Sequence, residues 1–285
     1  MRTLDLPGGG TMPAFGLGTW HLGERPASRR AEVAAVREAI ALGYRLIDSA
    51  EMYGEGGAEE VVGQALAEAL RTGDVRREQI FIVSKVYPHN ASRQGTAAAC
   101  ARSLRRLGLD HVDLYLLHWR GPHPLAETIE AMRALQADRR IAHWGVSNFD
   151  VDDLRELQAA CGPTFDCAAN QVYYSLGERG AAHSLLPWQR QRGMPLMAYS
   201  PIDQGALARE PGLRALAQRL GATPAQIALA WLLVQPGVAA IPKASRSAHL
   251  RENLAAADLV LDTDTLAELA RLFPPPPSKP PLAVL

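Results

Sequence analysis

The chain has 285 residues, and its 30 basic side chains balance its 30 acidic ones, so the formal net charge is zero. A neutral balance gives no reason to expect nucleic acid or an anionic membrane as a partner. The N-terminus has no apolar run of signal-peptide length and no stretch is long enough to span a bilayer, so we expect a cytoplasmic protein. The sparse cysteines Cys100, Cys161 and Cys167 favour the same compartment, as buried reduced thiols.

Predicted strands and helices alternate along the chain after a short hairpin. Residues 4–11, with three consecutive glycines inside, predict a β-hairpin. Short apolar segments predict strands at residues 13–20, 45–50, 80–86, 112–119, 141–148, 168–174, 195–202 and 238–244. Helices are expected at residues 27–42, 58–70, 92–107, 125–137, 181–192, 248–257 and 263–272, after Asp150 and on both sides of Gly221. Ser28 and Asp150 are the expected caps of two of these helices.

Repeated strand–helix units of this kind indicate a parallel sheet that is covered by helices. For a chain of this length the simplest such fold is a (β/α)₈ TIM barrel, so we expect one barrel domain over residues 1–285. A doubly wound sheet is the alternative, but no GxGxxG motif follows an early strand. The expected barrel carries the hairpin at its N-terminus and, after a C-terminal helix, an extended proline-rich tail at residues 274–285.

Polar side chains near the ends of consecutive strands form a candidate catalytic group. Asp48 and Tyr53 follow from the second strand, Lys85 lies in the third and His118 in the fourth. The C-terminal ends of barrel strands meet at one face, which carries the active site in such enzymes. An ammonium lowers the pKa of a neighbouring phenol, so Lys85, held by Asp48, would tune Tyr53 as a general acid. With His118 holding a carbonyl oxygen near the phenol, this set suits carbonyl reduction.

Several ordered motifs resemble those of the aldo-keto reductase family over nearly the whole chain. They are GYRLIDSAEMYGEG around Tyr53, the end of the strand with Lys85, YLLHW, GVSNF, NQVYYS, AYSPI and IPKASRSAHLRENL. Within that family the chain most resembles bacterial members that reduce small aldehydes and dicarbonyls such as methylglyoxal. The resemblance implies NAD(P)H-dependent reduction of aldehydes or ketones to alcohols, with Tyr53 as the proton donor.

The resemblance also implies a cofactor site and a substrate pocket. Ser147, Asn148 and Gln171 would hold the nicotinamide carboxamide, and Tyr199 would stack on the ring. The pyrophosphate and adenosine end would lie against Ser200, Ile202, Gln204, Gly205, Lys243, Ala244, Ser245, Arg246, His249, Glu252 and Asn253. The expected substrate-binding residues are Trp20, Tyr87, His118 and Trp119.

One departure from the family pattern bears on the choice of cofactor. Many NADPH-dependent members carry an arginine six residues after the lysine of the IPK motif, where it meets the 2′-phosphate. Here that position is His249. Lys243, Ser245 and Arg246 could still bind a phosphate, so we expect NADP (NADPH), with NAD as the alternative.

The same residues leave other interpretations open. Asp48 could be a helix N-cap, and with Glu51 or Glu55 it could serve a glycosidase, although such carboxylates usually come from different strands. The chain could also be a cofactor-binding regulatory subunit with little turnover. The remaining histidines, His21 among them, are expected at surface or structural positions, and no HxH or HExxH spacing predicts a metal site. We expect a monomer that acts on a small-molecule carbonyl substrate.

Overall fold

The structure is a computed structural model that describes residues 2–285. Its first strands, β1 (Thr3–Asp5) and β2 (Thr11–Pro13), pair antiparallel, as the hairpin prediction requires. Residues 8–10, all glycine with positive φ, lie between them. The hairpin side chains Leu4 and Met12 are buried in one cluster with Leu46 and Leu114, which lie early in their barrel strands. The hairpin therefore fills the barrel end opposite to the carboxyl ends of the strands.

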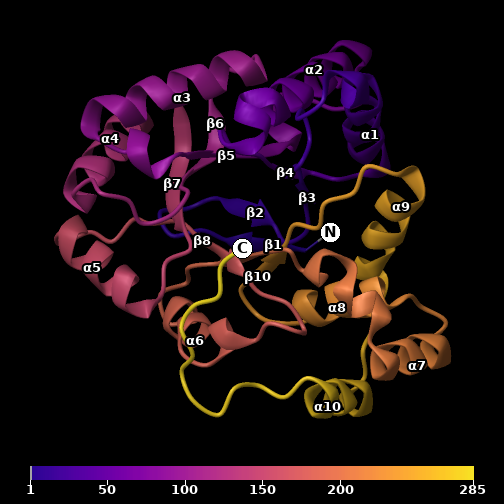
Figure 1. Ribbon diagram of the computed structural model, residues 1–285. Helices are drawn as coiled ribbons and strands as arrows, with labels where there is room; N and C mark the ends of the chain where they lie inside the picture. The colour runs from indigo at the N-terminus through magenta and orange to yellow at the C-terminus, as the bar shows by residue number, and fades with distance from the viewer. Residues whose placement is uncertain (1) are drawn as a thin grey trace.

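Eight parallel strands form the barrel, and each is hydrogen-bonded to the next in sequence. They are β3 (Leu17–Gly18), β4 (Leu46–Asp48), β5 (Phe81–Val86), β6 (Val112–Leu117), β7 (Ile141–Ser147), β8 (Asn170–Tyr173), β9 (Leu196–Tyr199) and β10 (Val238–Ala240). The sheet closes because Phe15 pairs with Ala240 and Gly18 pairs with Lys243, both in parallel register. The predicted (β/α)₈ barrel is therefore confirmed, with helices arranged around the strands (Figure 1).

Amphipathic helices cover the outside of the strands. They are α1 (Arg29–Leu42), α2 (Gly57–Thr72), α3 (Arg93–Leu107), α4 (Leu125–Ala137), α5 (Val151–Cys161), α6 (Leu185–Arg190), α7 (Pro211–Leu220), α8 (Pro224–Leu233), α9 (Ser247–Ala255) and α10 (Thr263–Leu272). The apolar faces of these helices and the outward side chains of the strands form one continuous buried core. The predicted bounds 125–137 and 263–272 coincide with α4 and α10.

Some local predictions differ from the structure. Ser28 does not cap α1, because its own backbone is already helical (φ −91°, ψ −15°), whereas a cap residue needs extended backbone. Its single hydroxyl proton instead faces two acceptors, the carbonyl of Arg25 (2.9 Å) and Glu32 (2.7 Å). Asp150 does cap α5, accepting from the amide of Val151 at 2.7 Å. The strand predicted at residues 13–20 is divided, since its start pairs with β1 and its end with β4 and β10. The helix predicted at residues 181–192 is limited to α6 and a preceding 3₁₀ turn at Gly180–Ala182.

The proline-rich tail returns to the barrel after α10. Arg179 donates to the carbonyl of Phe273 at its start, and Lys279 pairs with Asp150 at 2.8 Å and with Asp152 at 3.2 Å. Residues 274–285 form neither helix nor strand, and the chain end lies over the strands in Figure 1. The described residues thus share one barrel, which supports our proposal of a single domain.

The cysteines and the apolar segments can also be compared with expectation. Cys100, Cys161 and Cys167 are buried and unpaired in the structure, as expected. Between residues 2 and 285, no helix combines the length and apolar character needed to cross a membrane.

Candidate active site

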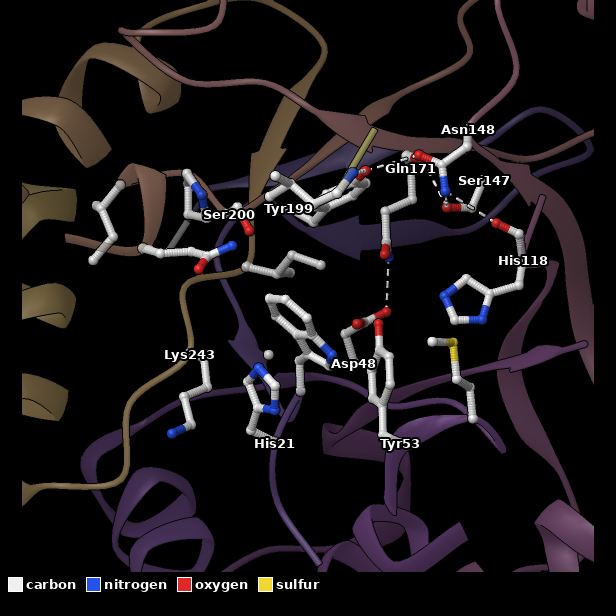
Figure 2. A pocket seen from close by; sticks show the side chains of 18 of the residues that line it. His21, Asp48, Tyr53, His118, Ser147, Asn148, Gln171, Tyr199, Ser200 and Lys243 are labelled. Atoms are coloured by element: carbon white, nitrogen blue, oxygen red, sulfur yellow. Dashed lines mark hydrogen bonds between the residues drawn. The ribbon is translucent and has the colours of Figure 1, made fainter. Parts of the chain in front are cut away.

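A cavity of about 440 Å³ opens at the carboxyl ends of the barrel strands, where barrel enzymes carry their active sites. The labelled side chains in Figure 2 converge on it from several strands. The predicted site residues that line it are Trp20, Asp48, Tyr53, His118, Trp119, Ser147, Asn148, Gln171, Tyr199, Ser200, Ile202, Gln204, Gly205, Lys243 and His249. Residues that are distant in sequence are therefore brought together much as the strand-end pattern predicts.

Lys85 lies beneath the cavity floor as the centre of a buried polar group. Its side chain is fully buried, and Nζ lies 2.8 Å from Asp48 Oδ2 and 3.0 Å from Tyr53 Oη. Nζ also donates to the carbonyl of Ser49 at 2.9 Å, while Asp48 Oδ1 accepts from Gln171 Nε2 at 2.7 Å. All three ammonium protons and both carboxylate oxygens thus have partners, which a buried ion pair requires. Lys85 acts on the cavity through Tyr53.

The protonation of this group differs in one respect from the sequence-based expectation. Burial raises the pKa of Tyr53, Lys85 lowers it and Asp48 raises it, with a net upward direction. Lys85 therefore lowers the pKa of Tyr53, as expected, but the desolvation of the buried phenol raises that pKa by more. Burial lowers the pKa of Lys85, whereas Asp48 and Tyr53 raise it, again with a net upward direction. Near neutrality the phenol is protonated beside an ammonium, which would stabilise the phenolate left after the proton is donated.

His118 faces Tyr53 across the cavity floor as a neutral imidazole. The two rings meet edge to face with centroids 5.7 Å apart. Burial and the nearby Lys85 hold the pKa of His118 well below its usual value, so the ring is neutral at pH 7. Its Nδ1 is buried without a hydrogen-bond partner among residues 2–285. A neutral imidazole can donate one N–H, and such a group suits the role of holding a carbonyl oxygen.

The side chains expected to hold a nicotinamide carboxamide form a hydrogen-bonded row next to His118. Tyr199 Oη donates to Asn148 Oδ1 at 2.9 Å, and Asn148 Nδ2 donates to the carbonyl of His118 at 3.2 Å. The Ser147 hydroxyl donates to the carbonyl of Gln171 at 2.8 Å. Asn148 has φ of 59°, a left-handed conformation that asparagine tolerates better than most residues. This row is therefore fixed in place by its own contacts (Figure 2).

The cavity continues beyond Tyr199 toward a basic end. Ser200 and Gln204 have φ of 45° and 51°, and the chain between them lines this part of the cavity. Lys243 and His249 line its far end. His249 Nε2 lies 2.9 Å from Arg246 Nη2; because arginine can only donate, Nε2 is the acceptor. An ammonium with a neighbouring guanidinium is a donor set that suits a phosphorylated ligand.

Several predicted site residues lie outside the cavity lining. Tyr87 packs edge to face on Trp119 at 6.0 Å, and its hydroxyl donates to Glu55 at 3.3 Å, so it supports the rim. The carboxylate of Glu252 accepts from the hydroxyl of Thr223 at 2.5 Å. Of the others, Ala244 and Asn253 are buried, and Ser245 and Arg246 are exposed beside the basic end.

Other lining residues were not among the site residues predicted from sequence, namely Gly18, His21, Met52, Ile241 and Leu285. His21 is exposed, as expected, yet it also lines the cavity because its ring stacks on Trp20 with centroids 4.1 Å apart. Its position in sequence next to Trp20, a predicted substrate-binding residue, is the feature from which its place in the cavity lining could have been predicted. Leu285 comes from the tail, and its amide lies 3.4 Å from Tyr199 Oη.

Comparisons with known proteins agree with this geometry. The model of the Aldo/keto reductase family matches residues 14–273. The chain is 46% identical over 283 residues to "Methylglyoxal reductase YeaE" of Escherichia coli (strain K12), which covers 98% of this chain and 97% of that relative. An aldo-keto reductase from Klebsiella pneumoniae in complex with NADPH superposes with a TM-score of 0.92 at 46% identity, covering 100% of this chain and 99% of that one. A thermostable aldo-keto reductase, Tm1743, in complex with the inhibitor epalrestat gives 0.87 at 39% identity, covering 95% and 100%. The chain therefore belongs to the aldo/keto reductase family, a family of oxidoreductases.

Proposed function

We propose that this protein reduces aldehydes and ketones to alcohols with NADPH, and that Tyr53 donates the proton. The observation that carries this proposal is the placement of the Tyr53 hydroxyl. It lies at the cavity floor, 3.0 Å from the buried Lys85 ammonium, which is itself 2.8 Å from Asp48. A protonated phenol whose conjugate base would be stabilised by a fixed cation is suited to general acid catalysis.

The cavity residues fit a nicotinamide dinucleotide. Asn148, Gln171 and Tyr199 form the wall for the nicotinamide end, and Lys243 with His249 forms the basic end for phosphate. NADPH supplies the hydride when bound. The chain's own residues hold the carbonyl oxygen between His118 and Tyr53, supply the proton from Tyr53 and exclude water with the surrounding aromatic side chains. The NADPH complex of the similar Klebsiella pneumoniae structure supports this choice of cofactor.

Small aldehydes and dicarbonyls such as methylglyoxal are the proposed substrate class. The relative from Escherichia coli, a methylglyoxal reductase by name, supports this class. Trp20 and Trp119 contribute apolar surface to the lining of the cavity. A regulatory subunit with little turnover is the second candidate, and the complete contacts of Lys85, Asp48 and Tyr53 favour turnover over it.

The test is Tyr53→Phe, assayed with methylglyoxal and NADPH. Loss of the proton donor should lower kcat by about 10²- to 10⁴-fold. NADPH binding, followed by nicotinamide fluorescence, should remain as in the wild type. Tyr174→Phe is the matched control, since its hydroxyl donates to Gln235 at 2.8 Å away from the cavity. Wild-type turnover in Tyr53→Phe would refute the role of Tyr53, and an inactive wild type that binds NADPH would favour the regulatory subunit.

A further inference from the structure

The segment that carries Tyr53 has an unusual backbone. In the 3₁₀ turn Tyr53–Gly56, the residues Gly54, Glu55 and Gly56 have φ of 58°, 53° and 91°. Left-handed backbone is unfavourable for a residue with a side chain such as Glu55, and it persists only where the surroundings enforce it. The structure therefore has to contain contacts that hold this turn.

One set of contacts comes from glycines that meet backbone to backbone. A Cβ on Gly54 would lie 2.9 Å from the carbonyl carbon of Gly23, and a Cβ on Gly23 would lie 2.1 Å from that of Gly57. Such close approach is possible only without side chains. The turn thus rests directly on the loop that follows Trp20.

The other side of the turn rests on Arg106 of α3. A Cβ on Gly56 would lie 2.3 Å from Arg106 Cζ, so the guanidinium packs against bare backbone. Arg106 Nη1 also lies 3.0 Å from Glu59 Oε2, and Glu59 Oε1 accepts from the Ser84 hydroxyl at 2.6 Å. Glu59 is completely buried, so this ion pair ties α3 to the start of α2 and to the strand of Lys85.

Arg102, on the same helix, forms a second ion pair, with Glu51. Its Nη2 lies 2.9 Å from Glu51 Oε2, and Glu51 Oε1 accepts from the amide of Tyr87 (2.9 Å) and from Asn90 Nδ2 (3.0 Å). Arg102 and Arg106 are one helical turn apart and share a face of α3. The two guanidiniums therefore clamp the chain on both sides of Tyr53, at Glu51 and at Glu59.

We propose that Arg102 and Arg106 are positioning residues that set the place of the Tyr53 hydroxyl. The proposal rests on the proton-donor role of Tyr53 given above. Neither arginine lines the cavity. Among residues 2–285 the phenol oxygen has one hydrogen bond, at 3.0 Å to Lys85, so the place of the oxygen depends on the backbone of its turn. A misplacement of about 1 Å in a catalytic group can cost about 10²-fold in rate.

The first test compares Arg102→Met with Arg133→Met. Arg133, on α4, is exposed to a similar degree (37% against 36% for Arg102) and pairs with Asp166 at 2.6 Å away from the Tyr53 turn, so it serves as a control for lost stability. Arg102→Met should lower kcat by up to about 10²-fold with NADPH affinity unchanged. Arg102→Lys should recover part of the loss. Glu51→Gln, which keeps an acceptor for Tyr87 and Asn90 but removes the charge, should reproduce the loss in kcat.

The second readout needs no substrate. With ¹³Cζ-tyrosine incorporated, the Tyr53 resonance can be assigned from its absence in Tyr53→Phe. It should shift in Arg102→Met and Glu51→Gln, and should stay in place in Arg133→Met. An unshifted resonance in both loop variants would overturn the proposal, as would a fall in kcat that Arg133→Met shares. Because this measurement is independent of turnover, it tests the positioning role even if Tyr53→Phe disproves the proposed reaction.

Discussion

Replacing Lys85 by methionine should harm stability and activity through the same buried contacts. The lysine side chain is fully buried, and its ammonium joins Asp48, Tyr53 and the carbonyl of Ser49. Methionine fills a similar volume without the charge. Asp48 would then remain as a buried carboxylate with the Gln171 amide as its side-chain donor.

The magnitude follows from the uncompensated charge. Removing one partner of a buried ion pair typically costs about 3–5 kcal/mol of unfolding free energy. Asp48 is 2% exposed, so water can offset little of that cost. The phenol also loses the ammonium that lowers its pKa, so activity should fall by about 10²- to 10⁴-fold, the usual worth of general acid catalysis.

A double-mutant cycle tests the reasoning at pH 7. There the ion pair is intact, because the raised pKa of Lys85 means its contribution is lost only as the pH rises through that value. Asp48→Asn alone should also destabilise, since it leaves the ammonium unpaired. Asp48→Asn added to Lys85→Met should recover part of the stability, because no buried charge then remains. Denaturant unfolding of the four proteins gives the coupling, and strictly additive losses would refute a buried, mutually compensating pair.

Other sites give further expectations. His249→Arg adds a guanidinium beside Arg246, so NADPH affinity in a fluorescence titration should rise by about tenfold, while NADH affinity should not. Burial holds the pKa of His118 below its unfolded value, so stability should fall as the pH drops below about 6.5, and unfolding measured against pH should be less steep in His118→Gln. Leu285→Ala removes apolar surface from the cavity wall and so weakens substrate binding. In steady-state kinetics, KM for a small carbonyl should rise by about tenfold at most while kcat is maintained.

The barrel and the reactive group could be predicted because both follow from local patterns. Short apolar strands separated by amphipathic helices define the topology, and adjacent parallel strands place their carboxyl ends side by side. Asp48, Lys85 and His118 lie at or next to the ends of three successive strands, β4 to β6, so their proximity follows from chain order. Ser28 does not cap α1 because the 3₁₀ turn Pro26–Ser28 leads directly into the helix and gives Ser28 a helical backbone, and the sequence does not display that turn.

The electrostatics of the site depend on burial, which is a property of the whole fold. From sequence, the ammonium of Lys85 suggests a lowered phenol pKa for Tyr53. In the structure the same contact exists at 3.0 Å, but desolvation of the phenol is the larger effect and reverses the net direction. The ion pairs of Arg102 and Arg106 could not be predicted from sequence either, because they join α3 to residues on the two sides of the Tyr53 turn, some 50 residues earlier in the chain.

The proline-rich tail, residues 274–285, makes a contact far from its own start, because Leu285 at its end lies beside Tyr199. Its prolines favour an extended chain with a rise of about 3.1 Å per residue, so a segment of this length can cross the face of a barrel. Where it goes is set by α10, which fixes its start near Arg179, and by Lys279, which pairs with Asp150 at the start of α5. Those two attachments direct Leu285 to the cavity wall beside Tyr199. The prolines alone thus predict the extended form, whereas the contact with the cavity follows from attachments that only the folded barrel provides.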